Sequence, residues 1–424
     1  MPVISGPKGT RDFYPGDMSF RERIFSSWHA TCKRYSFELY DGPMFEHLEL
    51  YTQKSGDEIE KQLYTFQDKA GRLMALRPEL TPTLARMVAA KGANLKRPVR
   101  WYSIPRLFRY ERMQKGRLRE FFQLNMDILG IQGVAADAEL IAAVIDMMRD
   151  LGFTSEDFSV RISSRTLLEG LFLSLGVLPE NLAKLYLLLD KKHKITPDEF
   201  STELSAIASS DDQGERIRKV LTASSLSQIA DGKGDLPAIK ELENLFSLLS
   251  AYGLDDYVAL DIGIVRGLAY YTGIVFEVFD KMRSMRAIAG GGRYDRLVGL
   301  YGGPDTPAVG FAAGDVVLGE LYEAKFGAPG QAPRSDVFIV SFDQSRPHIA
   351  IDIARQLRSA GISCEFSLKT CGVGKQMEQA NTARSKIVVF VGGSESAEGK
   401  VKVKNMGTGE EKTVAANRLI EEIQ

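Results

Sequence analysis

Polar side chains near the first quarter of the chain follow a spacing that could bind a small charged molecule. In EFFQLNMDILG, Gln123, Asn125 and Asp127 lie two residues apart, so on a β-strand all three would project from one face. Arg109 and Glu111 share this spacing just upstream. Because arginine donates paired hydrogen bonds to carboxylates and phosphates, the pattern predicts a site for a zwitterionic or phosphorylated ligand. The alternative is an ordinary sheet with its polar face in water.

The loop between these two stretches is strongly basic. From Lys96 to Glu120 the sequence has nine basic and two acidic residues, whereas the whole chain of 424 residues has 54 basic and 55 acidic ones and a net charge of −1. The local excess predicts an anionic partner, although a solvated hairpin tip would look the same. The balanced total argues against a chain that coats nucleic acid along its whole length.

Two further segments carry candidate site residues. Arg266 stands in the apolar run DIGIVRGLAYYTGIVFEVF, and since charged side chains are rarely buried without a partner, it either reaches the surface or faces a pocket that holds an anion. Three consecutive glycines precede RYDRL at residues 290–292. They would let a ligand or another chain approach the backbone, or simply relieve crowding between a strand and a helix.

Several familiar signatures are missing from the sequence. GVGKQ departs from the phosphate-binding loop, no GxGxxG follows a strand-like segment, and GxSxG does not occur, so neither a nucleotide-binding loop of these types nor a serine nucleophile is indicated. The three cysteines and four histidines are dispersed, which predicts neither a disulfide framework nor a structural zinc site. With no apolar run near the roughly 20 residues that span a bilayer and no signal-peptide pattern, we expect a cytoplasmic protein that does not contact membranes.

Composition and periodicity divide the chain. The segment 327–334, rich in Gly, Pro and Ala, predicts a linker between a catalytic domain over 1–326 and an α/β domain over 335–424. Leucine-rich helical periodicity over about 171–252 predicts a helical insertion in the first domain. Strands are predicted on both sides of it, at 99–111, 120–130, 260–266, 272–279 and 286–291. This order favours an α+β fold with an antiparallel sheet.

The last ninety residues alternate between strand and helix patterns. Strands are predicted at 336–342, 363–368 and 386–391, and helices near 349–357, 375–383 and 414–423. Such alternation predicts a largely parallel or mixed sheet.

Together these motifs resemble the class II aminoacyl-tRNA synthetases, and within them the histidyl-tRNA synthetase family. The resemblance spans nearly the whole chain and rests on KGTRDFYP, LRPELTPTLAR, FRYERMQKGRLREFFQ, RGLAYYTGIVFE and GGGRYDRL. RGLxYY is the most specific of these, because it is similar to the histidine-binding signature of that family. The resemblance implies a class II catalytic domain, a C-terminal anticodon-binding domain and a homodimer. It also implies ATP-dependent ligation of L-histidine to tRNA(His), with Mg²⁺ accompanying ATP and no tightly held metal.

The resemblance also implies a role for each matching residue in amino-acid binding. The implied histidine-binding residues are Glu79, Leu80, Thr81, Arg109, Gln123, Asp127, Arg266, Tyr270 and Tyr271. Glu79, Thr81 and Gln123 would hold the α-ammonium group, and Asp127 and Tyr271 would bracket the imidazole.

Arg266 and Arg109 are the implied catalytic residues. In adenylate formation a carboxylate attacks a phosphate, so two negative groups must be brought together and their charge stabilised. The implied ATP-binding residues are Arg109, Glu111, Arg112 and Gly310. The implied contacts with the tRNA acceptor stem are Gln114, Lys115, Arg117 and Arg119.

The chain departs from the family pattern at three positions. The family usually has an acidic residue where Ala269 stands, and often glutamate where Asp127 stands. In GFAAGDVVL, Val317 occupies the place of an arginine that contacts ATP. If the chain is an active ligase, we expect another cation, such as Arg112 or Arg293, to replace that arginine.

Val317 also favours an alternative function. A synthetase-like regulatory subunit of ATP phosphoribosyltransferase would keep the core of the fold and sense histidine without catalysis. The presence of Arg266, Tyr271, Glu79 and Gln123, with a full C-terminal domain, favours the ligase. A nucleic-acid-binding module without catalysis would explain the basic loop but not the paired polar faces.

Overall fold

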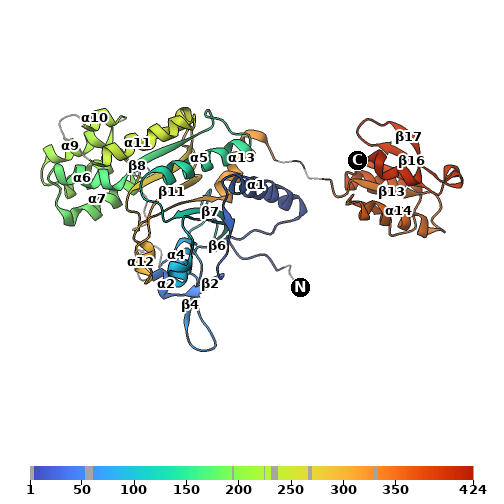
Figure 1. Ribbon diagram of the computed structural model, residues 1–424, viewed down its shortest axis with the longest axis horizontal. Coiled ribbons are helices and arrows are strands. Elements are labelled where there is room, and N and C mark those ends of the chain that lie inside the picture. The colour runs from blue at the N-terminus through green and yellow to red at the C-terminus, as the bar shows by residue number, and fades with distance from the viewer. Residues whose placement is uncertain are drawn as a thin grey trace. The chain divides into compact units, whose positions relative to one another are not determined.

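The structure is a computed structural model that describes residues 4–52, 61–192, 195–223, 225–230, 237–265, 270–328, 330 and 333–423. Arg266 and Ala269 lie outside these residues. The chain divides into two compact units, Met1–Pro329 and Gly330–Gln424 (Figure 1).

The first unit is built on a large mixed sheet. In the described part of the chain its order is β1-β5-β7-β12-β11-β10-β8-β9, with β6 paired to β7. The strands are β1 (Glu38–Leu39), β5 (Val99–Ser103), β6 (Arg106–Phe108), β7 (Glu120–Leu129), β8 (Phe158–Ser164), β9 (Val258–Leu260), β10 (Ile274–Asp280), β11 (Ala289–Arg293) and β12 (Ala308–Gly314). Neighbouring strands are antiparallel except for the outer pairs β1–β5 and β8–β9. The predicted α+β fold class is confirmed.

Helices cover both faces of this sheet. On one face α5 (Ala135–Asp150), a helix that is buried along most of its length, packs with α1 (Pro15–Arg34) and α13 (Asp315–Phe326) in the main hydrophobic core. A second core joins α4 (Thr81–Lys91) and α12 (Leu297–Leu300) to residues of β5, β7, β10 and β12. A small sheet in the order β2-β4-β3 adjoins α4, and a short helix, α2, follows β2; these elements span Phe45–His47 (β2), Leu73–Leu76 (β4), Thr65–Gln67 (β3) and Glu49–Thr52 (α2).

A cluster of helices occupies one end of the first unit (Figure 1, green to yellow). Its members are α6 (Arg165–Ser174), α7 (Pro179–Lys191), α8 (Pro197–Ile207), α9 (Asp211–Leu221), α10 (Leu226–Ala230) and α11 (Pro237–Ala251). The helices begin earlier than the leucine periodicity indicates, because the Ser164 hydroxyl caps α6 by accepting a bond from the Leu167 amide at 3.2 Å. Short 3₁₀ helices lie at Gly92–Asn94 and Asp255–Tyr257.

Two strand predictions near the basic loop are wrong in their extent. The strand predicted over 99–111 is divided into β5 and β6 around Pro105, which has no N–H to donate to a ladder, and β6 ends at Phe108. Arg109 and Glu111 therefore lie in the loop. The strand predicted over 286–291 forms at Ala289–Arg293 instead, which leaves Arg286 in the β10–β11 connection.

The second unit is a mixed sheet in the order β14-β13-β15-β16-β17. Its strands are β13 (Val337–Ser341), β14 (Cys364–Phe366), β15 (Ile387–Val391), β16 (Lys400–Asn405) and β17 (Glu411–Ala415). The first three are parallel and the last two antiparallel. Two separate apolar clusters, one with α14 (Pro347–Ser359) and one with α15 (Val373–Ala383), cover the sheet.

The helix predicted over 414–423 is wrong in its first half. Residues 411–415 form β17, and only Leu419–Ile423 is α-helical (α16), after a 3₁₀ turn at Ala416–Arg418; a further 3₁₀ turn spans Ser394–Glu398. Val401 and Val403 are buried while Lys400, Lys402 and Lys404, which alternate with them, are not, which is the period-two pattern of β16. Among the described residues, no helix is long and apolar enough to cross a membrane.

Candidate active site

The register of two central strands opens a space above the sheet. Gln123, Asn125 and Asp127 of β7 lie opposite Gly314, Ala312 and Gly310 of β12 respectively. A Cβ atom on Gly310 would overlap the carboxylate of Asp127. The small residues of β12 therefore leave room for the polar face of β7 to meet a ligand.

Asp127 carries a buried carboxyl group that forms no ion pair with the described residues. The Tyr294 hydroxyl donates to its Oδ1 at 2.5 Å. Burial raises the pKa of Asp127 to about 7, and the bond from Tyr294 works in the opposite direction. Tyr40 is near enough for its own pKa to be raised by the charge on Asp127, and its buried hydroxyl has no hydrogen-bond partner among the described residues. The site thus offers a proton acceptor surrounded by hydroxyl groups.

A second carboxylate lies at the start of α4. The Tyr270 hydroxyl donates to Oε2 of Glu79 at 3.0 Å, and both side chains line the same pocket as Asp127. Burial and the neighbouring Glu79 charge raise the pKa of Tyr270 well above its usual value. Thr81 also lines the pocket, whereas the Leu80 side chain is fully buried and does not. Segments about 190 residues apart in sequence therefore meet at this point.

Arg109 supplies the positive charge in the described lining of this pocket. Its Nε donates to the Pro78 carbonyl at 2.9 Å, and its guanidinium lies 5.3 Å from the centre of the Phe121 ring. These contacts hold the cation in place near Gln123 on the adjoining strand.

The pocket brings together most of the residues that the sequence singled out. Its described lining is Glu79, Thr81, Arg109, Gln123, Asn125, Asp127, Tyr270, Tyr271, Tyr294, Gly310, Phe311 and Ala312. Sequence reasoning did not assign Tyr294 a role. Its position directly after the three glycines and Arg293 was the available signal, but nothing in the sequence shows which face its side chain takes.

The basic loop is held by contacts within itself and to α13. Arg117 forms an ion pair of 2.8 Å with Glu111, whose side chain is only 8% exposed. The guanidinium of Arg119 lies 4.3 Å from the centre of the Tyr110 ring, and the Gly116 amide donates to Oε1 of Glu320 at 3.0 Å. Arg112, Gln114 and Lys115 are exposed; none of the four predicted acceptor-stem residues lines the pocket.

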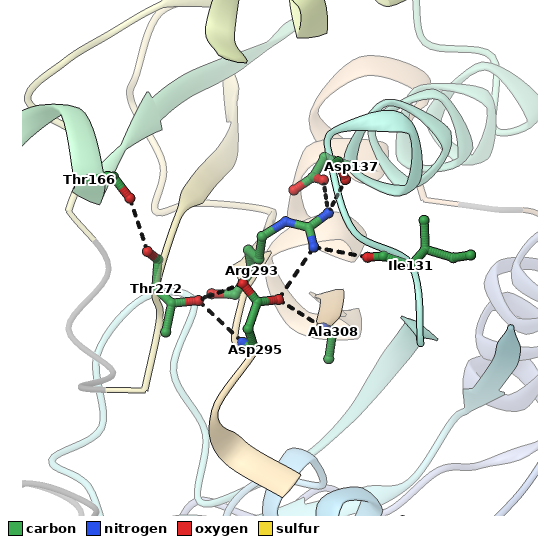
Figure 2. A network of polar contacts seen from close by, with 8 residues as sticks. Ile131, Asp137, Thr166, Thr272, Arg293, Asp295 and Ala308 are labelled. Carbon is green, nitrogen blue, oxygen red and sulfur yellow. Dashed lines mark hydrogen bonds and ion pairs between the residues drawn. The ribbon is translucent and has the colours of Figure 1, made fainter. Parts of the chain in front are cut away.

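Arg293 is not the cation that replaces the arginine missing at Val317. Its guanidinium donates to the carboxylates of Asp137 and Asp295 and to two backbone carbonyls, those of Ile131 and Gly133. Figure 2 shows this buried network beside the sheet. Because two carboxylates already balance its charge, Arg293 has no role left toward a triphosphate.

The same network positions the segment that carries Tyr270 and Tyr271. The Thr272 amide donates to the Arg293 carbonyl at 2.7 Å, and the Asp295 amide donates to the Thr272 hydroxyl at 3.2 Å (Figure 2). Asp295 in turn accepts from the Ala308 amide at 2.9 Å. The two tyrosines are therefore anchored to β11 and β12, next to Asp127.

No group of three or more His, Cys, Asp or Glu side chains within the described ranges is placed to hold a metal ion. The described lining of the pocket instead combines hydrogen-bond acceptors and donors with the cation of Arg109, which suits a zwitterionic amino acid beside a phosphate.

Comparisons with known proteins agree with this arrangement. Residues 9–315 match the family model of histidyl-tRNA synthetase, and residues 336–424 match that of the anticodon binding domain. Among curated proteins, the chain is 41% identical over 426 residues to the histidine–tRNA ligase of Opitutus terrae, covering 99% of this chain and 98% of that protein. It is 39% identical over 419 residues to the chloroplastic/mitochondrial histidine–tRNA ligase of Arabidopsis thaliana, covering 98% and 86% respectively.

Solved structures share the fold. A histidyl-tRNA synthetase from a Nostoc species matches 100% of this chain and 99% of its own with a TM-score of 0.86 at 24% identity. The apo histidyl-tRNA synthetase of S. aureus matches 99% of this chain and 100% of its own with a TM-score of 0.73 at 26% identity.

Proposed function

The chain belongs to the histidyl-tRNA synthetase family, and from this premise we propose that it ligates L-histidine to its cognate tRNA in an ATP-dependent reaction that passes through histidyl-adenylate. The observation that carries the proposal is the buried carboxyl group of Asp127, which faces a pocket with a second carboxylate and Arg109 at its other sides. An acceptor, an anion and a cation in one pocket match an imidazole, an ammonium and a carboxylate in one ligand.

Recognition of histidine rests on hydrogen bonds that other amino acids cannot make. Asp127 accepts a bond from an imidazole N–H, and Tyr271 bounds the ring on the other side. Glu79 and Gln123 receive the α-ammonium group, with Thr81 at the start of α4. A pocket built around a buried acceptor rejects side chains that leave the acceptor unpaired.

The first chemical step joins the amino acid to the α-phosphate. A carboxylate oxygen of histidine forms a bond to the α-phosphorus, and the bond from that phosphorus to its β-bridging oxygen breaks, so that pyrophosphate leaves. Arg109 lowers the repulsion between the two anions and stabilises the charge that gathers on the phosphorus oxygens. The RGLAYY motif assigns the same role to Arg266, which lies outside the described residues. Glu111 accepts from the adenine amine, Arg112 and Gly310 adjoin ATP, and Mg²⁺ enters bound to ATP as part of that substrate.

The second step transfers histidine to tRNA. A terminal ribose hydroxyl attacks the carbonyl carbon and gives its proton to a phosphate oxygen of the adenylate, and the bond from the carbonyl carbon to the α-phosphate oxygen breaks, so that AMP leaves. The exposed loop residues Gln114 and Lys115, with Arg117 and Arg119, meet the acceptor stem through its phosphates, and the C-terminal unit binds the anticodon. The active form is a homodimer.

A regulatory role without catalysis is the second candidate, and it is not favoured. One structural neighbour, from Bacillus halodurans, is described as an ATP phosphoribosyltransferase regulatory subunit/histidyl-tRNA synthetase, with a TM-score of 0.76 at 23% identity. That likeness concerns the fold alone. The match of residues 336–424 to an anticodon binding domain and the full-length likeness to ligases favour tRNA as the partner.

ATP–pyrophosphate exchange, measured with each amino acid in turn and without tRNA, tests this function. We expect exchange with histidine alone. A folded protein that binds histidine but supports no exchange would instead be the regulatory type.

A further inference from the structure

Arg286 lies in the β10–β11 connection, far in sequence from the basic loop that it contacts. Its Nη2 donates to Oε1 of Gln114 at 2.6 Å, across 172 residues of sequence. Its side chain is partly buried, so the guanidinium is fixed against the loop and is not a free surface group.

The methylene stem of Arg286 packs at the place where Val317 meets the loop. A Cβ atom built on Gly116 would lie 3.1 Å from Cγ2 of Val317, 3.7 Å from Cδ of Arg286 and 3.9 Å from Oε2 of Glu320. Gly116 has a φ of +72°, and its amide is bonded to Glu320. Arg286 thus stands beside the one residue of α13 at which the family pattern has an ATP-contacting arginine.

The charge of Arg286 is not balanced by a carboxylate. Within the described residues it forms no ion pair, since Glu111 pairs with Arg117 at 2.8 Å and Glu320 accepts from the Gly116 amide. Burial and repulsion from Arg117 lower the pKa of Arg286, and Glu111 opposes them. Arg117 and Arg286 both lie near Glu111, which among the described residues is paired with Arg117 alone. The two arginines therefore leave an excess of positive charge at the loop, which an anion would relieve.

The other arginines near this point have partners or stacking contacts. Arg11 pairs with Asp315 at 2.6 Å, Arg106 pairs with Glu120 at 2.9 Å, and Arg119 lies over the ring of Tyr110. Arg293 is neutralised by Asp137 and Asp295. Arg286 is therefore the cation at Val317 that is fixed in place and still lacks a counter-ion in the described part of the chain.

We propose that Arg286 binds the triphosphate of ATP and replaces the arginine that is absent at position 317. Its guanidinium reaches the phosphates from the β10–β11 connection, whereas the arginine of the family pattern would reach them from α13. Gln114 orients the guanidinium by accepting one of its N–H groups and leaves the others for phosphate oxygens. This inference rests on the proposed function, because it assigns a residue to the ATP of the same reaction.

The test is ATP–pyrophosphate exchange with histidine in the full-length chain. Loss of a charge-assisted bond predicts an ATP KM about tenfold higher in Arg286→Ala, with the histidine KM and the thermal midpoint of unfolding unchanged. Arg286→Lys keeps the charge but not the planar fork, so its ATP KM should rise less. Lys281→Ala, an exposed lysine in the same connection, is the matched control and should behave as the parent protein.

The possible outcomes separate the two proposals. Exchange in the parent protein with an unchanged ATP KM in Arg286→Ala would overturn this inference and leave the function standing. A raised ATP KM in Arg112→Ala, and not in Arg286→Ala, would overturn it in the same way. Equal losses for ATP and histidine with a lowered unfolding midpoint would mark Arg286 as structural and also overturn it. A folded parent protein with no exchange would refute the function and this inference together.

Discussion

Arg293 and Tyr294 are neighbours at the end of β11, yet they serve two different buried carboxyl groups. Arg293 pairs with Asp137 and with Asp295, whereas Tyr294 donates to Asp127 at 2.5 Å. Burial raises the pKa of the buried aspartate in each site, to about 6 for Asp137 and about 7 for Asp127. The chemical difference lies in the donor, a cation in one case and a neutral hydroxyl in the other.

That difference separates a structural carboxylate from the one that we propose binds the ligand. A guanidinium neutralises Asp137 and fixes α5 to the sheet, so nothing further can bind there. A tyrosine hydroxyl orients Asp127, and no cation among the described residues balances its charge. In the proposed function, the raised pKa of Asp127 is a consequence of burying an acceptor that binds the imidazole.

Removing the structural carboxylate should have the largest effect. Asp137→Ala leaves the buried Arg293 with the half-exposed Asp295 as its ion-pair partner among the described residues, so we expect the free energy of unfolding to fall by about 3–5 kcal/mol. Chemical denaturation measures this. Asp146→Ala, on the same helix, removes a partly exposed pair with Arg149 and a bond from the Tyr35 hydroxyl at 2.8 Å, and should cost about 1–2 kcal/mol. Equal effects of the two variants would show that the Arg293 network does not hold α5.

Removing the charge of Asp127 should weaken histidine binding. Asp127→Asn keeps the size and the bond from Tyr294 but offers the imidazole a weaker acceptor, so we expect the histidine KM in exchange to rise about 100-fold while the ATP KM stays unchanged. An unchanged histidine KM would remove Asp127 from imidazole recognition.

The stability of Asp127→Asn provides the control for folding. The pKa of Asp127 is about 7 in the folded chain and 3.8 in its ordinary state, so the folded form binds the proton more tightly and this carboxyl group destabilises the fold progressively as pH rises from 4 through 7. At pH 8 the variant should therefore be more stable than the parent, on the order of 4 kcal/mol, and the advantage should vanish near pH 4.

The pH dependence of histidine binding should show the same titration. Below about pH 7 Asp127 takes up a proton and loses the charge that makes it a strong acceptor for the imidazole N–H, so the histidine KM should rise as pH falls, by at most about tenfold per pH unit. Free histidine also gains a proton near pH 6.5, and Asp127→Asn isolates that contribution. Identical pH profiles for the parent and the variant would contradict the role of Asp127.

The sequence could predict the position of Asp127 better than the partner of Arg293. Period-two spacing is a local property, so Gln123 and Asp127 were correctly placed on one face of β7, and the α+β class followed from the order of elements. The partner of Arg293 is 156 residues away in α5, and no local pattern reveals it. The prediction that Arg293 serves ATP failed for that reason.

The basic loop also has contacts that no local sequence pattern reveals. A proline within a strand-like run could have indicated the break between β5 and β6, but the approach of Arg286 to Gln114 depends on how β10, β11 and α13 pack. Sequence reasoning offered Arg112 and Arg293 as cations because they stand in recognised motifs. Arg286 stands in none, and only tertiary structure brings it beside Val317.

Removing the Tyr294 hydroxyl, which distinguishes the Asp127 site from the Asp137 site, should have the smallest effect. Tyr294→Phe removes the donor to Asp127 and keeps the ring, so the free energy of histidine binding should weaken by about 1 kcal/mol, or roughly fivefold in KM. Because the bond from Tyr294 lowers the pKa of Asp127, its loss should move the midpoint of the pH profile upward. Tyr301→Phe, which removes a hydroxyl bonded to the Leu50 carbonyl outside the pocket lining, should leave the midpoint in place. If Tyr294→Phe lowers the midpoint or leaves it unchanged, Tyr294 does not set the charge state of Asp127. The donors Tyr294 and Arg293 would then differ in how they pack and not in how they affect the charge of their aspartates.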